Sequence, residues 1–164
     1  MRSLAIGIKL KESIQCPKYQ LITDSREQEN LIFTKLNIFD YVTDKLDVGD
    51  YALRLSNGLL FNKIIERKGL QDLVGTLSAG YKRFKEEINR AKESGINLII
   101  AIEGTRDDVL RGTIYSNREG SEVVKQLNTL YVRYGVEFWY CASREDMAMR
   151  ISDLFHAVYR DLES

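Results

Sequence analysis

The stretch Leu59-Leu60-Phe61-Asn62-Lys63-Ile64-Ile65-Glu66-Arg67-Lys68 decides how the rest of this sequence is interpreted. Its apolar run predicts a buried strand that ends with a carboxylate at Glu66 and an ammonium at Lys68, on one face because side chains alternate along a strand. The preceding Gly49-Asp50-Tyr51 should add Asp50 to that face. A surface salt bridge is the simpler explanation of these three residues alone. Two carboxylates that converge with a lysine are, however, what a magnesium-dependent phosphodiesterase requires.

A β-hairpin should bring Asp50 to Glu66. The segment Tyr51–Leu55 alternates between the two faces, and the sequence of residues 56–58 predicts a turn. A two-residue turn would place the carboxylates on opposite faces, because a slip of one residue inverts every side chain. The shared site therefore requires a loop of odd length or a β-bulge. We expect a three-residue loop at residues 57–59, which would pair Asp50 with Glu66.

Strands and helices should alternate along the rest of the chain, which is typical of a layered α/β domain. We expect further strands at residues 19–23, 39–45, 96–102 and 136–141. We expect helices at residues 27–35, at 70–94 with a break near 78–80, at 121–134 with Ser121 as cap, and at the C-terminus after Ser143. Residues 105–120 lack periodicity and are predicted to form a long polar loop. Acidic residues fall at strand ends, where ligands collect in open α/β sheets: Asp24, Asp50, Glu66 and Glu103.

The composition is that of an ordinary globular protein, with one domain at residues 19–164 and an N-terminal extension at residues 1–18. The 24 basic residues balance the 24 acidic ones, so no global positive field attracts nucleic acid. Without a secretory signal or a membrane-length apolar segment, we expect an intracellular protein, cytoplasmic and nucleoid-associated if its source is prokaryotic or viral. Cys16 and Cys141 are expected to be reduced and structural.

Several of these residues belong to motifs that follow one another in a fixed order. Thr23-Asp24-Ser25-Arg26-Glu27 comes first, Gly49-Asp50 and Glu66-Arg67-Lys68 follow, and Asp72 comes last. This order resembles the Asp-x-Arg-Glu element and the GD…ERK-x-x-x-D signature of the XPF/Hef family of structure-specific DNA endonucleases. The resemblance extends over roughly residues 21–162 and concerns the nuclease domain. We therefore expect a stand-alone form without the helix-hairpin-helix module of many relatives.

The resemblance implies a three-layer α/β/α, restriction-endonuclease-like core around a central mixed sheet. It also implies a hydrolase that cuts DNA phosphodiester bonds with Mg²⁺ or Mn²⁺ held by Asp50 and Glu66. Lys68 would orient the attacking water, and Asp24 would complete the catalytic group by holding a water or Lys68. Supporting roles fall to Arg26, Arg67 and Asp72.

Members of this family commonly cut branched duplexes such as flaps and forks, which suggests a role in DNA repair or recombination. We expect DNA contacts from basic side chains, although a solvated charged surface is the simpler explanation of them: Lys82, Arg83, Arg106 and Arg111. The family also implies a homodimer, which would use the wide apolar stripes of the helix at 121–134 and the C-terminal helix. A separate protein is a further expected source of DNA targeting.

A non-catalytic DNA-binding or scaffold subunit with the same fold is the alternative function. Such a protein is expected to lose at least one of Asp50, Glu66 and Lys68, and all three are present. An unrelated α/β binding domain would require the whole ordered motif to arise by chance.

Overall fold

The predicted buried strand before Glu103 lies deep in a mixed sheet in the computed structural model, which describes residues 18–113 and 116–164. This strand, β5 (Asn97–Glu103), pairs in parallel with β4 (Lys63–Gly69) and with β6 (Glu137–Cys141). Its side chains alternate between two hydrophobic cores, with Ile100 on one face of the sheet and Ile99 on the other. A strand that is covered on both faces needs such a continuous apolar run.

The other three strands complete a six-stranded sheet with the order β2-β1-β3-β4-β5-β6. β1 (Tyr19–Asp24) pairs in parallel with β2 (Phe39–Asp44) and antiparallel with β3 (Tyr51–Arg54). β3 in turn pairs antiparallel with β4, as the predicted hairpin requires. The predicted strands are therefore confirmed, except that the return strand begins at Lys63 instead of Leu59, and Leu59 is exposed.

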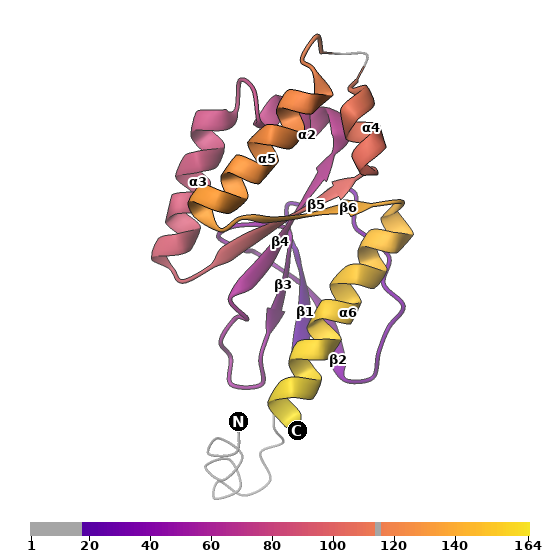
Figure 1. Cartoon of the computed structure of the whole chain (residues 1–164). Helices are drawn as coiled ribbons and strands as arrows, with labels where there is room; N and C mark the ends of the chain where they lie inside the picture. Colours follow the sequence, from indigo (N-terminus) through magenta and orange to yellow (C-terminus); the bar gives the residue numbers. More distant parts are fainter. Residues whose placement is uncertain (1–17, 114–115) are drawn as a thin grey trace, which may run out of the picture.

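Helices cover both faces of the sheet and complete the predicted α/β/α layers (Figure 1). α2 (Leu70–Thr76), α3 (Tyr81–Glu93) and α5 (Gly120–Tyr134) pack on one face, called here the α3 face. α6 (Arg144–Glu163) packs on the opposite face, called here the α6 face. The break between α2 and α3 lies where the sequence predicts it.

One predicted helix is wrong, because residues 25–38 contain no helix or strand and pack on the α6 face. Leu31 is buried whereas the adjacent Ile32 is 91% exposed, so the apolar side chains here do not follow a helical stripe. The Leu31 N–H donates to the Tyr51 hydroxyl at 2.9 Å instead of to a helical carbonyl. Packing and hydrogen bonding to the sheet outweigh the local helical pattern.

The predicted polar loop at residues 105–120 is also partly wrong, because it contains the helix α4 (Arg106–Arg111). The Thr105 hydroxyl accepts from the Asp108 N–H at 3.1 Å, and the Asp108 carboxylate accepts from the Thr105 N–H at 2.8 Å. This capping box is the sequence signal that the prediction missed. α5 then begins at Gly120 with Glu119 as its N-cap, so Ser121 lies inside the helix and does not cap it.

The predicted N-terminal extension, with Cys16, lies outside the described residues except for Lys18. Cys141 is a buried free thiol, as expected. Of the helices in the described ranges, none combines the length and the apolarity needed to cross a membrane.

The junction between α4 and α5 leaves no room for a side chain at Gly120. A Cβ there would lie 2.2 Å from the Val109 carbonyl oxygen and 2.3 Å from the Leu110 carbonyl oxygen. Because backbone atoms cannot move aside as a flexible side chain can, we expect Gly120→Ala to lower the free energy of unfolding by about 1–3 kcal/mol. Urea denaturation followed by circular dichroism measures this loss.

Gly75→Ala is the matched control for that substitution. Nothing lies within 4 Å of a Cβ at Gly75 in α2, so alanine should be neutral there or stabilise the protein by about 0.5–1 kcal/mol. Equal unfolding midpoints for the two variants would contradict the close contact at Gly120.

Candidate active site

The hairpin of β3 and β4 brings Asp50 to Glu66. Tyr51 pairs with Ile65, and the Asp50 N–H donates to the Ile65 carbonyl at 2.7 Å. Ile64 and Ala52 enter the core of the α3 face, so the alternation of each strand places both carboxylates on that face. The predicted pairing is therefore present at the end of the hairpin that carries the site.

The hairpin loop itself differs from the prediction. It occupies residues 56–58, one residue earlier than expected, and Arg54 faces Leu60 just beyond it. From this bridge to the Tyr51–Ile65 pair, three steps along β3 correspond to five steps along the return arm. The return arm therefore contains a β-bulge of two extra residues. Because the offset is even, every side chain keeps its face and the carboxylates stay together.

Gly49 allows the chain to approach β4 closely. Its φ of 77° lies in the left-handed region, and a Cβ would lie 2.4 Å from the Ile64 Cγ2. Glycine alone adopts this position without strain. This explains why glycine precedes aspartate here. Gly49 lets the backbone lie against β4, and the next residue, Asp50, places its carboxylate beside Glu66.

Asp50 and Glu66 form a pair of acidic groups largely removed from water. The Asp50 Oδ2 accepts from the Arg67 N–H at 2.8 Å, and the two carboxyls interact electrostatically with each other. Burial, reinforced by the charge of Asp50, raises the pKa of Glu66 to about 8. Burial likewise raises the pKa of Asp50. The pair therefore favours retaining a proton near neutral pH unless a cation offsets its charge.

This pair has the chemistry of a divalent-cation site. Glu66 is only 9% exposed, and its Oε2 has no hydrogen-bond partner, which is uncommon for a buried oxygen. Mg²⁺ is usually bound by one or two carboxylates, with water completing its octahedron. Within the described residues, no three His, Cys, Asp or Glu side chains are grouped so as to hold one metal ion. The two-carboxylate set thus fits Mg²⁺ or Mn²⁺ better than a cation that needs an all-protein cage.

Lys68 projects to the same face as Glu66, as the strand alternation predicts. Its Nζ lies 6.0 Å from the centroid of the Phe84 ring. Lys68 also lines an open groove of about 690 Å³, whose other walls come from α2, α3 and residues after α4. Asp72, exposed in the first turn of α2, lines the same groove. An ammonium in this position can meet a phosphate or a water molecule as a point charge.

Asp24 orders the backbone beside the carboxylate pair. Its Oδ1 accepts from the Leu46 N–H at 2.8 Å, and its Oδ2 accepts from the Arg26 Nε at 3.0 Å. Burial opposes the charge of Asp24, but these hydrogen bonds hold its pKa below the ordinary value. The carboxylate therefore fastens the end of β1 to the segment after β2. The Arg26 guanidinium is exposed and lies within electrostatic reach of Asp50 and Glu66.

Arg67 and Glu103 form an ion pair on the opposite face of the sheet from Asp50 and Glu66. The Arg67 guanidinium donates to Glu27 at 2.9 and 3.0 Å and to Glu103 at 2.6 Å. Glu103 also accepts from Arg144, at the start of α6, at 2.6 Å. The expected convergence of Glu103 on Asp50 and Glu66 is wrong, because Ile102 occupies the α3 face and its neighbour must project to the α6 face. Alternation along the strand could have revealed this, but not the partners Glu27 and Arg144.

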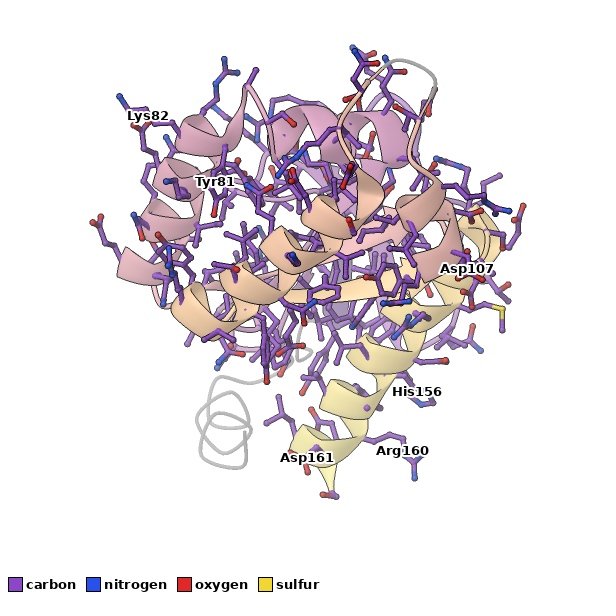
Figure 2. All side chains as sticks on the ribbon, turned by 45° about the horizontal axis from the view of Figure 1, so that its top comes forward. Tyr81, Lys82, Asp107, His156, Arg160 and Asp161 are labelled. Carbon is purple, nitrogen blue, oxygen red and sulfur yellow. The ribbon has the colours of Figure 1, made fainter. Side chains whose placement is uncertain are left out.

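The basic residues expected to contact DNA lie on two helices. Lys82 and Arg83 are exposed in the first turn of α3, and Arg83 lines the groove. Figure 2 shows Lys82 at the outer edge of α3. Arg106 and Arg111 are exposed on α4, where Arg111 forms an ion pair with Asp108. Arg83 is thus the member of this set that borders the same groove as Lys68.

The mixed sheet with helices on both faces defines an α/β domain of the XPF nuclease type. The Gly-Asp pair, the buried carboxylates and the adjacent lysine occupy the end of its hairpin. Residues 22–154 match the ERCC4 domain, and the chain belongs to that nuclease-domain family.

Two solved structures share the fold. XPF from Aeropyrum pernix superposes with a TM-score of 0.67 at 21% sequence identity, and the match covers 88% of this chain and 67% of that one. XPF from Aeropyrum pernix in complex with DNA gives a TM-score of 0.62 at 19% identity, over 88% of this chain and 66% of that one. The chain thus spans about two thirds of the length of these proteins. A search of curated proteins gives no significant match.

The raised pKa of Glu66 predicts how the stability of the metal-free protein depends on pH. The ordinary value for glutamate is 4.5, whereas Glu66 in the folded protein has a pKa of about 8. Between these values the folded state binds more protons than the unfolded state. The free energy of unfolding should therefore be highest at the acidic end of this window and fall as pH rises toward 8, with a slope approaching about 1.4 kcal/mol per pH unit.

Thermal denaturation at a series of pH values in the presence of a chelator measures this slope. Glu66→Gln should flatten it, because glutamine does not titrate. Glu93→Gln, at an exposed position near the end of α3, should leave it unchanged. A slope that is the same in all three proteins would contradict the assignment to Glu66.

Proposed function

We propose that this protein is a divalent-metal-dependent endonuclease that hydrolyses phosphodiester bonds in branched DNA such as flaps and forks. The observation that carries the proposal is the Glu66 carboxylate, which is buried beside Asp50 with one oxygen unpartnered. This arrangement destabilises the metal-free protein and becomes favourable when Mg²⁺ or Mn²⁺ binds. Membership of the ERCC4 nuclease-domain family supports the same activity.

The residues of the chain would have distinct roles in this reaction. Asp50 and Glu66 hold the cation, which supplies Lewis-acid stabilisation of the charge that develops on the phosphate. Lys68 orients the attacking water and offsets negative charge on the phosphate. Asp24 acts as a positioning residue through its hydrogen bond to the Leu46 N–H, rather than through contact with the substrate.

DNA would bind along the groove that contains Lys68. Arg26 interacts electrostatically with the carboxylate pair and Arg83 borders the groove on α3, which supports phosphate contacts by both. Because the whole chain has no net charge, such local groups must supply the salt-dependent part of the affinity. The likeness to an XPF structure determined in complex with DNA is consistent with this role. We place the enzyme in DNA repair or recombination, with further targeting from a second protomer or a separate protein.

A non-catalytic DNA-binding or scaffold subunit could share this fold. The carboxylate pair favours an enzyme, because a buried and unpartnered acidic oxygen lowers stability and has no role in a scaffold. Activity measurements separate the two functions directly.

Substitution of the carboxylates should abolish cleavage without unfolding the protein. We expect Asp50→Asn or Glu66→Gln to lower the rate of flap cleavage with Mn²⁺ by about 10³-fold, because the cation's stabilisation of charge is worth several kcal/mol. Both metal-free variants should be at least as stable as the wild type, since an amide replaces one of two buried acidic groups whose ionisation is unfavourable. Mn²⁺ should raise the melting temperature of the wild type and have much less effect on the variants.

Gel assays on flap, fork, nicked and linear duplexes measure cleavage, and Asp161→Asn is the control. Figure 2 shows Asp161 near the end of α6, where substitution should leave the rate unchanged. Wild-type rates in both carboxylate variants would reject the endonuclease, whereas DNA binding without cleavage by the wild type would favour the scaffold role.

We also propose a homodimer that forms across the β6 edge of the sheet. α5 and α6 pack on opposite faces beside this edge, so the expected interface on these two helices must include β6 (Figure 1). Val132 on α5 is 80% exposed, and the adjacent Tyr131 lines a hollow of about 420 Å³ together with Trp139. Exposed aromatic and aliphatic groups beside an open sheet edge are typical of protein interfaces.

The double substitution Tyr131→Asp and Val132→Asp should convert the dimer to a monomer, because it buries charge in the interface. Light scattering at roughly 50 μM protein detects the change, since an interface of about 1,600 Å² is normally stable at that concentration. Asn89→Asp, at an exposed position on α3, should remain dimeric. A wild-type protein that is monomeric under these conditions would rule the dimer out.

A further inference from the structure

Lys68 lies between two sources of negative charge. Asp50 and Glu66 interact with it electrostatically from the sheet. Glu87, on α3, lines the same groove as Lys68, and its charge also reaches Glu66. Among the described residues, however, no ion pair within 4.0 Å joins the Lys68 ammonium to a carboxylate. No ion pair within the described residues therefore fixes the position of this ammonium.

The α-helix directs Glu87 toward the ammonium. Phe84 and Ile88 are buried beneath α3, and Glu87 follows Phe84 by three residues, which places the two side chains on the same side of the helix. The Lys68 Nζ lies 6.0 Å from the centroid of the Phe84 ring. Glu87 is half-buried in the groove, whereas the preceding Glu86 is exposed. Glu87 is thus the acidic residue of α3 that shares both the groove with Lys68 and the side of the helix with the Phe84 ring.

Two other charged residues border the groove and could alter this interaction. Asp72 is turned toward the start of α2, where its Oδ2 would lie 3.7 Å from a Cβ at Gly69. Arg83 precedes Glu87 by four residues on α3 and is exposed, but no ion pair within 4.0 Å joins the two in the described part of the chain. Glu87 therefore remains available to Lys68.

A divalent cation at the carboxylate pair would reverse the forces on Lys68. It would cancel the negative charge of Asp50 and Glu66, and it would repel the ammonium. Without another anion nearby, the Lys68 side chain would extend into solvent, away from the phosphate of a DNA strand bound in the groove. We propose that Glu87 is a positioning residue that holds the Lys68 ammonium in the groove when the metal site is filled. This inference rests on the endonuclease function proposed above.

Nuclear magnetic resonance of the protein with ¹⁵N-labelled lysine side chains tests the contact without DNA or turnover. An ammonium held in an ion pair exchanges its protons with water more slowly than a free one, so its Nζ signal is observable. With saturating Mg²⁺, we expect the Lys68 signal in the wild type and in Glu86→Gln, and its loss in Glu87→Gln. Lys68→Arg identifies the signal. Retention of the signal in Glu87→Gln would overturn the proposal.

Cleavage kinetics provide the second measurement. Glu87→Gln should lower kcat by about 10–100-fold, the usual effect of losing a group that orients a catalytic residue. The Mn²⁺ concentration that gives half of the maximal thermal stabilisation should change far less than in Asp50→Asn, because Glu87 acts on the metal site only through its charge and does not hold the metal. Glu87→Asp should recover part of kcat, and Glu86→Gln should match the wild type. A normal kcat in Glu87→Gln would overturn the proposal.

The two proposals fail in different ways. If Asp50→Asn cleaves DNA as fast as the wild type, the endonuclease function itself is wrong. If Asp50→Asn is inactive while Glu87→Gln keeps both its kcat and its Lys68 signal, only the role of Glu87 is wrong.

Discussion

Two acidic groups, Asp50 and Glu66, are held together where little water can reach them, and the surrounding structure depends on this unfavourable contact. The backbone hydrogen bond from the Asp50 N–H to the Ile65 carbonyl and the close approach of Gly49 to Ile64 fix β3 against β4 beside the site. The two carboxylates therefore cannot move apart without breaking this backbone contact. The hydrophobic cores on both faces of the sheet supply the stability that offsets the repulsion. The carboxylates are thus held in place by the fold itself, as the proposed cation site requires.

The carboxylate pair lies on the α3 face of the sheet, whereas the ion pairs that Arg67 forms lie on the α6 face. Arg67 connects the two, because its backbone N–H fixes Asp50 while its guanidinium binds Glu27 and Glu103. Arg144 extends the network to the carbonyl oxygens of residues 29 and 30, which lie in the segment without regular structure. A network of charged groups with defined hydrogen-bond geometry can fix such a segment more specifically than apolar packing alone. The middle residue of the Glu-Arg-Lys motif is therefore structural, although both of its neighbours lie at the site.

Local patterns in the sequence predict the parts of this site that depend on neighbouring residues. Strand alternation places Glu66 and Lys68 on one face, and the hairpin pattern places Asp50 beside them. The helix expected at residues 27–35 is absent because its backbone is bound by the Tyr51 hydroxyl, which lies 20 residues away from Leu31. Hydrogen bonds over such separations are not visible in a local pattern, which is also why the partners of Arg67 were missed. The face of Glu103, in contrast, follows from alternation along β5, whereas its position at a strand end alone does not determine which face it occupies.

The β-bulge in the return arm separates the hairpin into two parts with independent registers. Pairing near the tip is set by the loop at residues 56–58, and pairing near the site is set by the contact between Tyr51 and Ile65. The tip lies at the end of the molecule opposite α2 (Figure 1), and Leu59 beside it is 66% exposed. Changes of length at the tip are therefore absorbed before they reach the carboxylates. This loop is the natural place to insert a peptide tag or a fluorescent label, and it is where related chains can differ in length without altering the chemistry.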